Sequence, residues 1–234
     1  MQAKDKRGWQ MMVGLAIVLT VGIWNLPYPW GYYILWPFTI LGTWVHEMGH
    51  GMMAAVFGDF HSLVMNPDGS GYARFSMARG ASVQKALVAA AGLLGPAVAG
   101  AFIIVFGREE KAARGIIGLL GALIGLSVVV YVRSTYGIAA MSAWSLGLIA
   151  LSSFGSDRVC FFTVQFLGVQ FCINNFRDFN YMFSASAGSL GASDTQQIAN
   201  NLFLPYWFWG AVVAASSLLL LGGALKIAAA DSKS

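Results

Sequence analysis

The sequence predicts an all-α integral membrane protein, a bundle of six or seven transmembrane helices with a short β-hairpin after the second span. Three observations indicate this fold class. Charged residues are rare, long stretches carry none at all, and one interval interrupts the apolar pattern with turn-forming residues. Residues 1–234 are expected to form a single polytopic domain.

The composition excludes a water-soluble globule. Charged residues make up 10% of the chain, 14 Lys or Arg and 10 Asp or Glu, whereas soluble domains carry about a quarter. Hydrophobic residues account for 57%, which also excludes a disordered chain. The basic residues are scattered singly or in small groups rather than along one face, so we expect the lipid bilayer, and no nucleic acid, as a partner.

Uncharged runs as long as a membrane span recur along the chain. A span needs about 20 predominantly apolar residues. The first run is too long for one helix, and Pro27 and Pro29 should break it, so we expect a first span over about 9–26 and a second over about 32–57. The remaining runs bring the total to six or seven spans. The uncharged runs cover residues 8–45, 86–107, 115–132, 134–156, 159–176 and 195–225.

The interval 59–80 is neither apolar throughout nor helical in its pattern. Two short segments that favour strands, 60–65 and 72–76, flank Asn66-Pro67-Asp68-Gly69-Ser70-Gly71. Proline and glycine at these positions suit a tight turn between two strands. The sequence therefore predicts a β-hairpin directly after the second span.

The second span contains the residues with the clearest chemistry, His46-Glu47-Met48-Gly49-His50. On a helix, His46 and His50 lie one turn apart on the same face, so both imidazoles can bind one Zn²⁺, and Glu47 lies beside them to serve a water. Packing is the alternative role, but ionisable groups inside a bilayer cost about 2.5–3.5 kcal/mol each. A metal ion bound by the imidazoles offsets that cost. The motif therefore predicts a metal site with Glu47 as the catalytic residue.

Further motifs follow this one as far as about Trp209. They are the turn Asp68-Gly69-Ser70-Gly71, then Ala91-Gly92-Leu93-Leu94-Gly95-Pro96, then Ser193-Asp194, Ile198-Ala199, Pro205 and Trp209. Together with the pentapeptide inside a membrane span, they resemble the site-2 protease family of intramembrane zinc metallopeptidases. The resemblance is greatest to its compact bacterial branch, the B-like part of peptidase family M-fifty. It implies one Zn²⁺ per chain and a multi-pass protein of the bacterial inner membrane.

A zinc hydrolase of this kind needs a third protein ligand and an open position for water. The region 174–200 offers two carboxylates, Asp178 and Asp194. Asp194 matches the Ser-Asp pattern of the compact branch and is our first choice, with Asp178 second. Each has another reading, because Asp194 also suits a helix N-cap and Asp178 follows Arg177 at a possible membrane interface. The chain lacks the late Asp-Gly motif of better-known family members, so the third ligand stays open.

Three more polar residues are weaker candidates. The resemblance places an amide near the zinc, so Asn174 or Asn175 would donate to an oxyanion or to substrate. Hydrogen bonding between helices is the more common role of a membrane Asn. His61 lies in the predicted hairpin, where a surface role is expected, because a fourth protein ligand would close the metal site.

The resemblance implies a zinc metalloendopeptidase that hydrolyses membrane-anchored proteins within or beside their transmembrane segment. Zinc would activate a water and polarise the scissile carbonyl, and Glu47 would transfer the proton to the leaving amine. The alternative is a non-catalytic metal-binding subunit or scaffold of a larger membrane complex. The missing Asp-Gly motif favours that alternative, whereas Glu47 has no use in a purely structural site.

Overall fold

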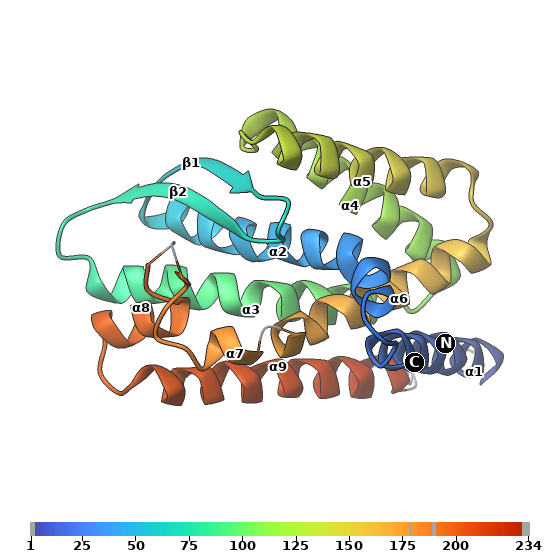
Figure 1. Ribbon diagram of the computed structural model, residues 1–234. Coiled ribbons are helices and arrows are strands. Elements are labelled where there is room, and N and C mark those ends of the chain that lie inside the picture. Colours follow the sequence, from blue (N-terminus) through green and yellow to red (C-terminus); the bar gives the residue numbers. More distant parts are fainter. Residues whose placement is uncertain (1–2, 178, 189–190, 231–234) are drawn as a thin grey trace.

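The computed structural model describes residues 3–177, 179–188 and 191–230. Long helices lie side by side, and one β-hairpin packs on the outside of α2 (Figure 1). The elements are α1 (Ala3–Trp24), α2 (Trp30–Phe57), β1 (Gly58–Met65), β2 (Gly71–Met77), α3 (Ser82–Phe106), α4 (Glu110–Val130), α5 (Thr135–Phe154), α6 (Asp157–Arg177), α7 (Phe179–Met182), α8 (Asp194–Asn201) and α9 (Tyr206–Ala229).

Four helices in the described part of the chain are long and apolar enough to cross a membrane, namely α3, α4, α5 and α9. A shorter apolar stretch, Gly8–Trp24, lies within α1. Helix α2 is 28 residues long, but its His and Glu residues lower its mean hydropathy. The chain is therefore a predominantly helical membrane protein with one hairpin, and the count of six or seven spans stays a prediction.

The outward faces of these helices are apolar. The exposed fraction is 90% for Phe154 at the end of α5 and 76% for both Val129 on α4 and Leu219 on α9. A protein that functions in water rarely presents contiguous apolar surface of this extent, whereas a lipid-facing helix requires it. Tyr28, between α1 and α2, and Trp30, the first residue of α2, are also strongly exposed, as aromatic residues at a membrane–water interface are.

Helix α3 is central, since it packs against α2, α6, α8 and α9. In Figure 1 it runs beside α2 over most of its length. The two helices approach closely at Gly49, where an added Cβ would come 2.4 Å from the carbonyl oxygen of Ala91. Small residues allow this close packing of membrane helices. This close contact with α3 fixes the position of α2 and therefore of His46 and His50.

The hairpin begins as soon as α2 ends. Strands β1 and β2 pair antiparallel, with Leu63 opposite Ala73. The other edge of β1 is covered, because the Leu63 N–H donates to the Tyr131 carbonyl and the Arg133 N–H donates to the Leu63 carbonyl. No strand in the described ranges pairs with the other edge of β2. The hairpin is thus anchored on one side, and within the described ranges the other edge has no strand partner, although its Ala73 N–H is hydrogen-bonded to Glu47.

Candidate metal centre

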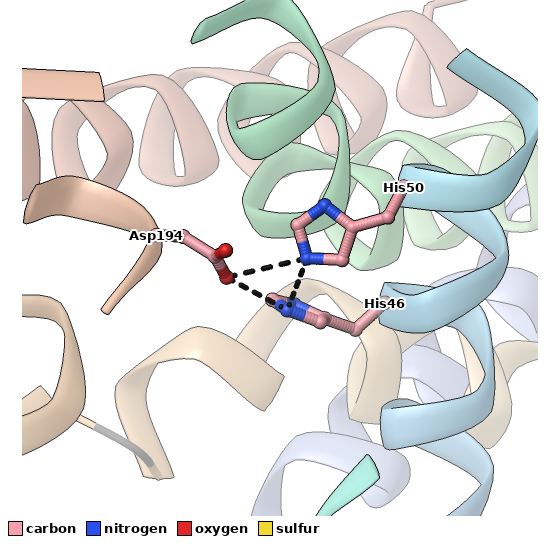
Figure 2. A group of neighbouring side chains, drawn as sticks. All are labelled: His46, His50 and Asp194. Carbon is pink, nitrogen blue, oxygen red and sulfur yellow. Dashed lines mark hydrogen bonds and ion pairs between the residues drawn. The ribbon is translucent and has the colours of Figure 1, made fainter. Parts of the chain in front are cut away.

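One helical turn of α2 presents two imidazoles to the same point. The Nε2 atoms of His46 and His50 lie 3.0 Å apart, and the two rings are nearly perpendicular, at 85°. This is the i, i+4 geometry that the sequence pattern predicts for one helix face. Both side chains point away from the axis of α2 toward a carboxylate from another element (Figure 2).

That carboxylate belongs to Asp194, the first residue of α8. Its Oδ2 atom lies 3.0 Å from His46 Nε2 and 3.3 Å from His50 Nε2. The helix N-cap is Ser193, whose hydroxyl accepts a hydrogen bond from the Gln196 N–H. Asp194 therefore does not serve as the cap, and its side chain is directed at α2. The three residues are the one group of His, Cys, Asp or Glu side chains among the described residues that could hold a metal ion.

The hydrogen bonding of His50 suits a metal ligand. Its Nδ1 lies 2.8 Å from the Val88 carbonyl oxygen, and a carbonyl only accepts, so Nδ1 carries the proton. A neutral His50 then has its lone pair on Nε2, 3.3 Å from a carboxylate oxygen that is also an acceptor. Two acceptors this close need either a proton or a metal ion between them. A backbone carbonyl that fixes the tautomer in this way is typical of metal-bound histidine.

The spacing of the three atoms fits a tetrahedral zinc site. With Zn–N bonds of about 2.0–2.1 Å, neighbouring ligand atoms lie about 3.3 Å apart. The three observed separations are 3.0, 3.0 and 3.3 Å. His50 is 8% exposed and Asp194 is 3% exposed, whereas His46 is only partly buried and lines both cavities described below.

A glycine of α3 makes room for His50. A Cβ on Gly92 would come 2.1 Å from His50 Cε1, so any side chain here collides with the ring. Three residues later, a Cβ on Gly95 would only reach ordinary contact, 3.4 Å from the Val45 carbonyl oxygen. The segment 91–96 stands out in the sequence only as a family motif, and in the structure its Gly92 leaves the space that the His50 ring occupies.

Glu47 lies next to this cluster and against the hairpin. Its side chain is buried, 6% exposed, and a Cβ on Gly71 would come 3.1 Å from Glu47 Cγ. The hairpin turn is held on α2 by Thr43, whose hydroxyl donates to the Gly69 carbonyl at 2.8 Å. Gly69 has φ +87°, a conformation that favours glycine. The turn and Glu47 are therefore positioned together.

Two cavities meet at the cluster. One has a volume of about 900 Å³ and extends from the α1–α2 connection past the hairpin turn, and the other has about 240 Å³ and lies along β2. The residues that line both are His46, Glu47, Gly71, Tyr181 and Ala187. Water and an extended chain therefore have room on two sides of the imidazoles and of Glu47.

Of the other residues singled out in the sequence, His61 is the one whose side chain is described, and it does not join this cluster. Asp178 lies outside the described residues. Asn174 and Asn175 belong to α6, but their side chains are not among those described. His61 lies on β1 with its Nε2 atom 3.0 Å from the Ser76 hydroxyl, on the exposed side of the hairpin.

Sequence reasoning missed Tyr181. This residue of α7 lines both cavities, and its hydroxyl lies 3.0 Å from Asp194 Oδ2. The surrounding Phe179-Asn180-Tyr181-Met182 matches no motif and has no periodicity that would mark it. Its proximity to Asp194 arises from the path of the chain between α7 and α8.

Comparison with known proteins gives a family for nearly the whole chain. The family model described as Peptidase M50B-like matches residues 11–224, which include the helical turn of α2, the hairpin and Asp194. No curated protein and no solved structure gives a significant match. The chain, with its apolar helices and its His-His-Asp group, belongs to the Peptidase M50B-like family.

Proposed function

We propose that the protein is an intramembrane zinc metalloendopeptidase. The observation that carries this proposal is the meeting of His46 Nε2, His50 Nε2 and Asp194 Oδ2 beside a buried Glu47, where two cavities join. Membership of a peptidase family gives the reaction class. Its substrates are membrane-anchored proteins cut within or beside their spans, in the bacterial inner membrane.

In this proposal each residue has a separate task. His46, His50 and Asp194 hold one Zn²⁺, which when bound supplies a Lewis acid that polarises the scissile carbonyl and makes water more acidic. Glu47 accepts a proton from the attacking water and delivers it to the leaving amine nitrogen. The Val88 carbonyl keeps the proton of His50 on Nδ1, so that Nε2 stays available as a ligand.

The edge of β2 that has no strand partner in the described ranges is the proposed binding surface for the scissile segment. Gly71, Tyr72, Ala73 and Phe75 of this strand line the smaller cavity together with Glu47. A transmembrane substrate helix has its carbonyls hydrogen-bonded internally, so it must unwind before hydrolysis. An unwound segment recovers those hydrogen bonds by pairing with the edge of β2 as an added strand.

The catalytic assignment is tested with Glu47→Gln in the full-length protein, solubilised in detergent and assayed on a membrane-anchored reporter. The variant should bind zinc as well as the wild type does and should cleave no reporter. Glu109→Gln is the matched control, because Glu109 is exposed before α4 and lines neither cavity. Cleavage at the wild-type rate by Glu47→Gln would refute the role of Glu47.

The strand-edge assignment is tested separately with Phe75→Pro compared with Phe75→Ala, since both variants remove the ring but only proline removes one N–H from the edge and cannot continue a strand pairing. Ala73 is avoided because its N–H is hydrogen-bonded to Glu47. We expect a higher KM for the reporter with Phe75→Pro than with Phe75→Ala, with zinc retained in both. Equal KM values would rule out pairing along β2 and leave the metal chemistry untouched.

A non-catalytic metal-binding subunit is the competing function. It predicts wild-type protein that binds zinc stoichiometrically and yet cleaves no membrane-anchored reporter. In that case Glu47→Gln would have no measurable consequence. The burial of Glu47 against the hairpin, facing both cavities, favours the enzyme.

A further inference from the structure

We propose that Tyr181 is a positioning residue that holds the Asp194 carboxylate in place as the third metal ligand. This inference rests on the proposed function, because it concerns the same metal centre. It adds a residue that belongs to none of the sequence motifs.

The phenol of Tyr181 binds Asp194 at two points. Its oxygen lies 3.0 Å from Asp194 Oδ2 and accepts a hydrogen bond from the Asp194 backbone N–H at 3.3 Å. A phenol has one proton to donate, and an ionised carboxylate only accepts, so the proton is directed to Oδ2. The backbone N–H is one of the first-turn donors of α8, which have no partner inside the helix. One hydroxyl group thus forms hydrogen bonds with both the carboxylate and the backbone N–H of Asp194.

The second carboxylate oxygen is held from the other side. The side-chain amide of Gln197, one turn along α8, donates to Asp194 Oδ1 at 3.3 Å. With Oδ1 held by Gln197 and Oδ2 held by Tyr181, the carboxylate cannot rotate freely about its side-chain bonds. The remaining lone pair of Oδ2 is directed at the two imidazoles of α2 (Figure 2).

The packing of α8 fixes the backbone of Asp194 but leaves the direction of its carboxylate to hydrogen-bond partners. Helix α8 has eight residues and packs mainly against α3 and α9 rather than against α2. Tyr181 belongs to a separate helix, α7, in which the neighbouring Met182 is buried, 1% exposed. A Cβ on Gly210 of α9 would come 2.5 Å from the Met182 carbonyl oxygen, so the backbone of α7 rests directly on α9. Tyr181 therefore gives the carboxylate a hydrogen bond from a second helix, α7, besides the one from Gln197 on its own helix.

Hydrogen-bonded partners of this kind change metal affinity by about 10- to 100-fold. A different role is conceivable for a phenol that lines both cavities, namely direct donation to the substrate. In the observed geometry the proton is used on Asp194 Oδ2. The two roles give opposite results in a zinc titration, because a direct donor to substrate leaves metal affinity unchanged.

The test is Tyr181→Phe in the full-length protein, with zinc affinity measured by competition against a chromophoric chelator. Phenylalanine keeps the ring and removes only the hydroxyl. We expect zinc affinity to fall by about 10- to 100-fold, the Tm of the zinc-free protein to fall slightly because the Asp194 N–H loses its partner, and saturating zinc to restore reporter cleavage with the wild-type KM. Tyr136→Phe on α5, a helix with no described residue in either cavity, is the matched control.

Two results would overturn the inference. Unchanged zinc affinity with a kcat that stays low at saturating zinc would make Tyr181 a donor to substrate. Unchanged affinity with a lowered Tm would make it a packing residue. Wild-type protein and His46→Ala are titrated in parallel. If the wild type binds no zinc, the proposed function fails together with this inference, whereas wild-type binding that Tyr181→Phe matches removes the inference alone.

Discussion

Replacing Gly92 by alanine should disable the metal centre without touching any ligand. The added Cβ would lie 2.1 Å from His50 Cε1 and 2.2 Å from Nε2, where ordinary contact begins at 3.4 Å. The ring or the helix behind it must therefore move by about 1.3 Å, because atoms cannot overlap. Metal–ligand distances tolerate only about 0.2 Å. Whichever part moves, Nε2 leaves its position relative to His46 and Asp194.

We expect zinc affinity to fall by about 100-fold or more, since a ligand and its bond to Val88 are both displaced. Overpacking of this size also costs about 1–3 kcal/mol of stability. The assay is chelator competition and thermal unfolding on full-length protein in detergent, followed by reporter cleavage. Gly95→Ala is the matched control, because the same change one turn along the same helix meets only ordinary contact at 3.4 Å. Wild-type zinc affinity in Gly92→Ala would refute the reasoning.

The remaining predictions concern the third ligand, its helix and the hairpin. Asp194→Asn should lower zinc affinity by more than about 100-fold, beyond what an outer hydrogen-bond partner contributes, whereas Asp178→Asn should leave it unchanged; the reverse result in the same titration would exchange the two assignments. Ser193→Ala removes the N-cap of α8 and should cost about 1 kcal/mol in thermal unfolding, so an unaltered Tm would contradict the capping role. Gly71→Ala, whose Cβ would come 3.1 Å from Glu47 Cγ, should lower kcat while zinc stays bound; a parallel loss of zinc would show that the hairpin supports the ligands rather than Glu47.

The hairpin shows which structural features a local sequence pattern can predict and which it cannot. Asn66-Pro67-Asp68-Gly69-Ser70-Gly71 indicates a turn, and a turn between two strands is found there. The sequence contains no sign that the far edge of β1 would be covered by residues 131–133 while the edge of β2 has no strand partner in the described ranges. That difference comes from the path of the chain between α4 and α5, and the proposed pairing of a substrate with β2 depends on it.

The glycines of α3 show a similar limit. The segment 91–96 is visible in the sequence only as a family motif. Which glycine faces a histidine cannot be read from spacing, because the rotation of α3 about its own axis depends on all the helices that pack on it. The structure separates Gly92, which makes room for His50, from Gly95, which does not.

The sequence by itself determined the class of protein and the half of the candidate site that lies within one helical turn. Low charge and long apolar runs are properties of composition, and the alignment of His46 with His50 follows from 3.6 residues per turn, so neither depends on distant parts of the chain. The tertiary structure alone decided that Asp194, 148 residues after His46, meets them, and that Tyr181 holds it there. Helix periodicity reaches a few residues, whereas these contacts depend on how α7, α8 and α9 pack against the rest of the bundle.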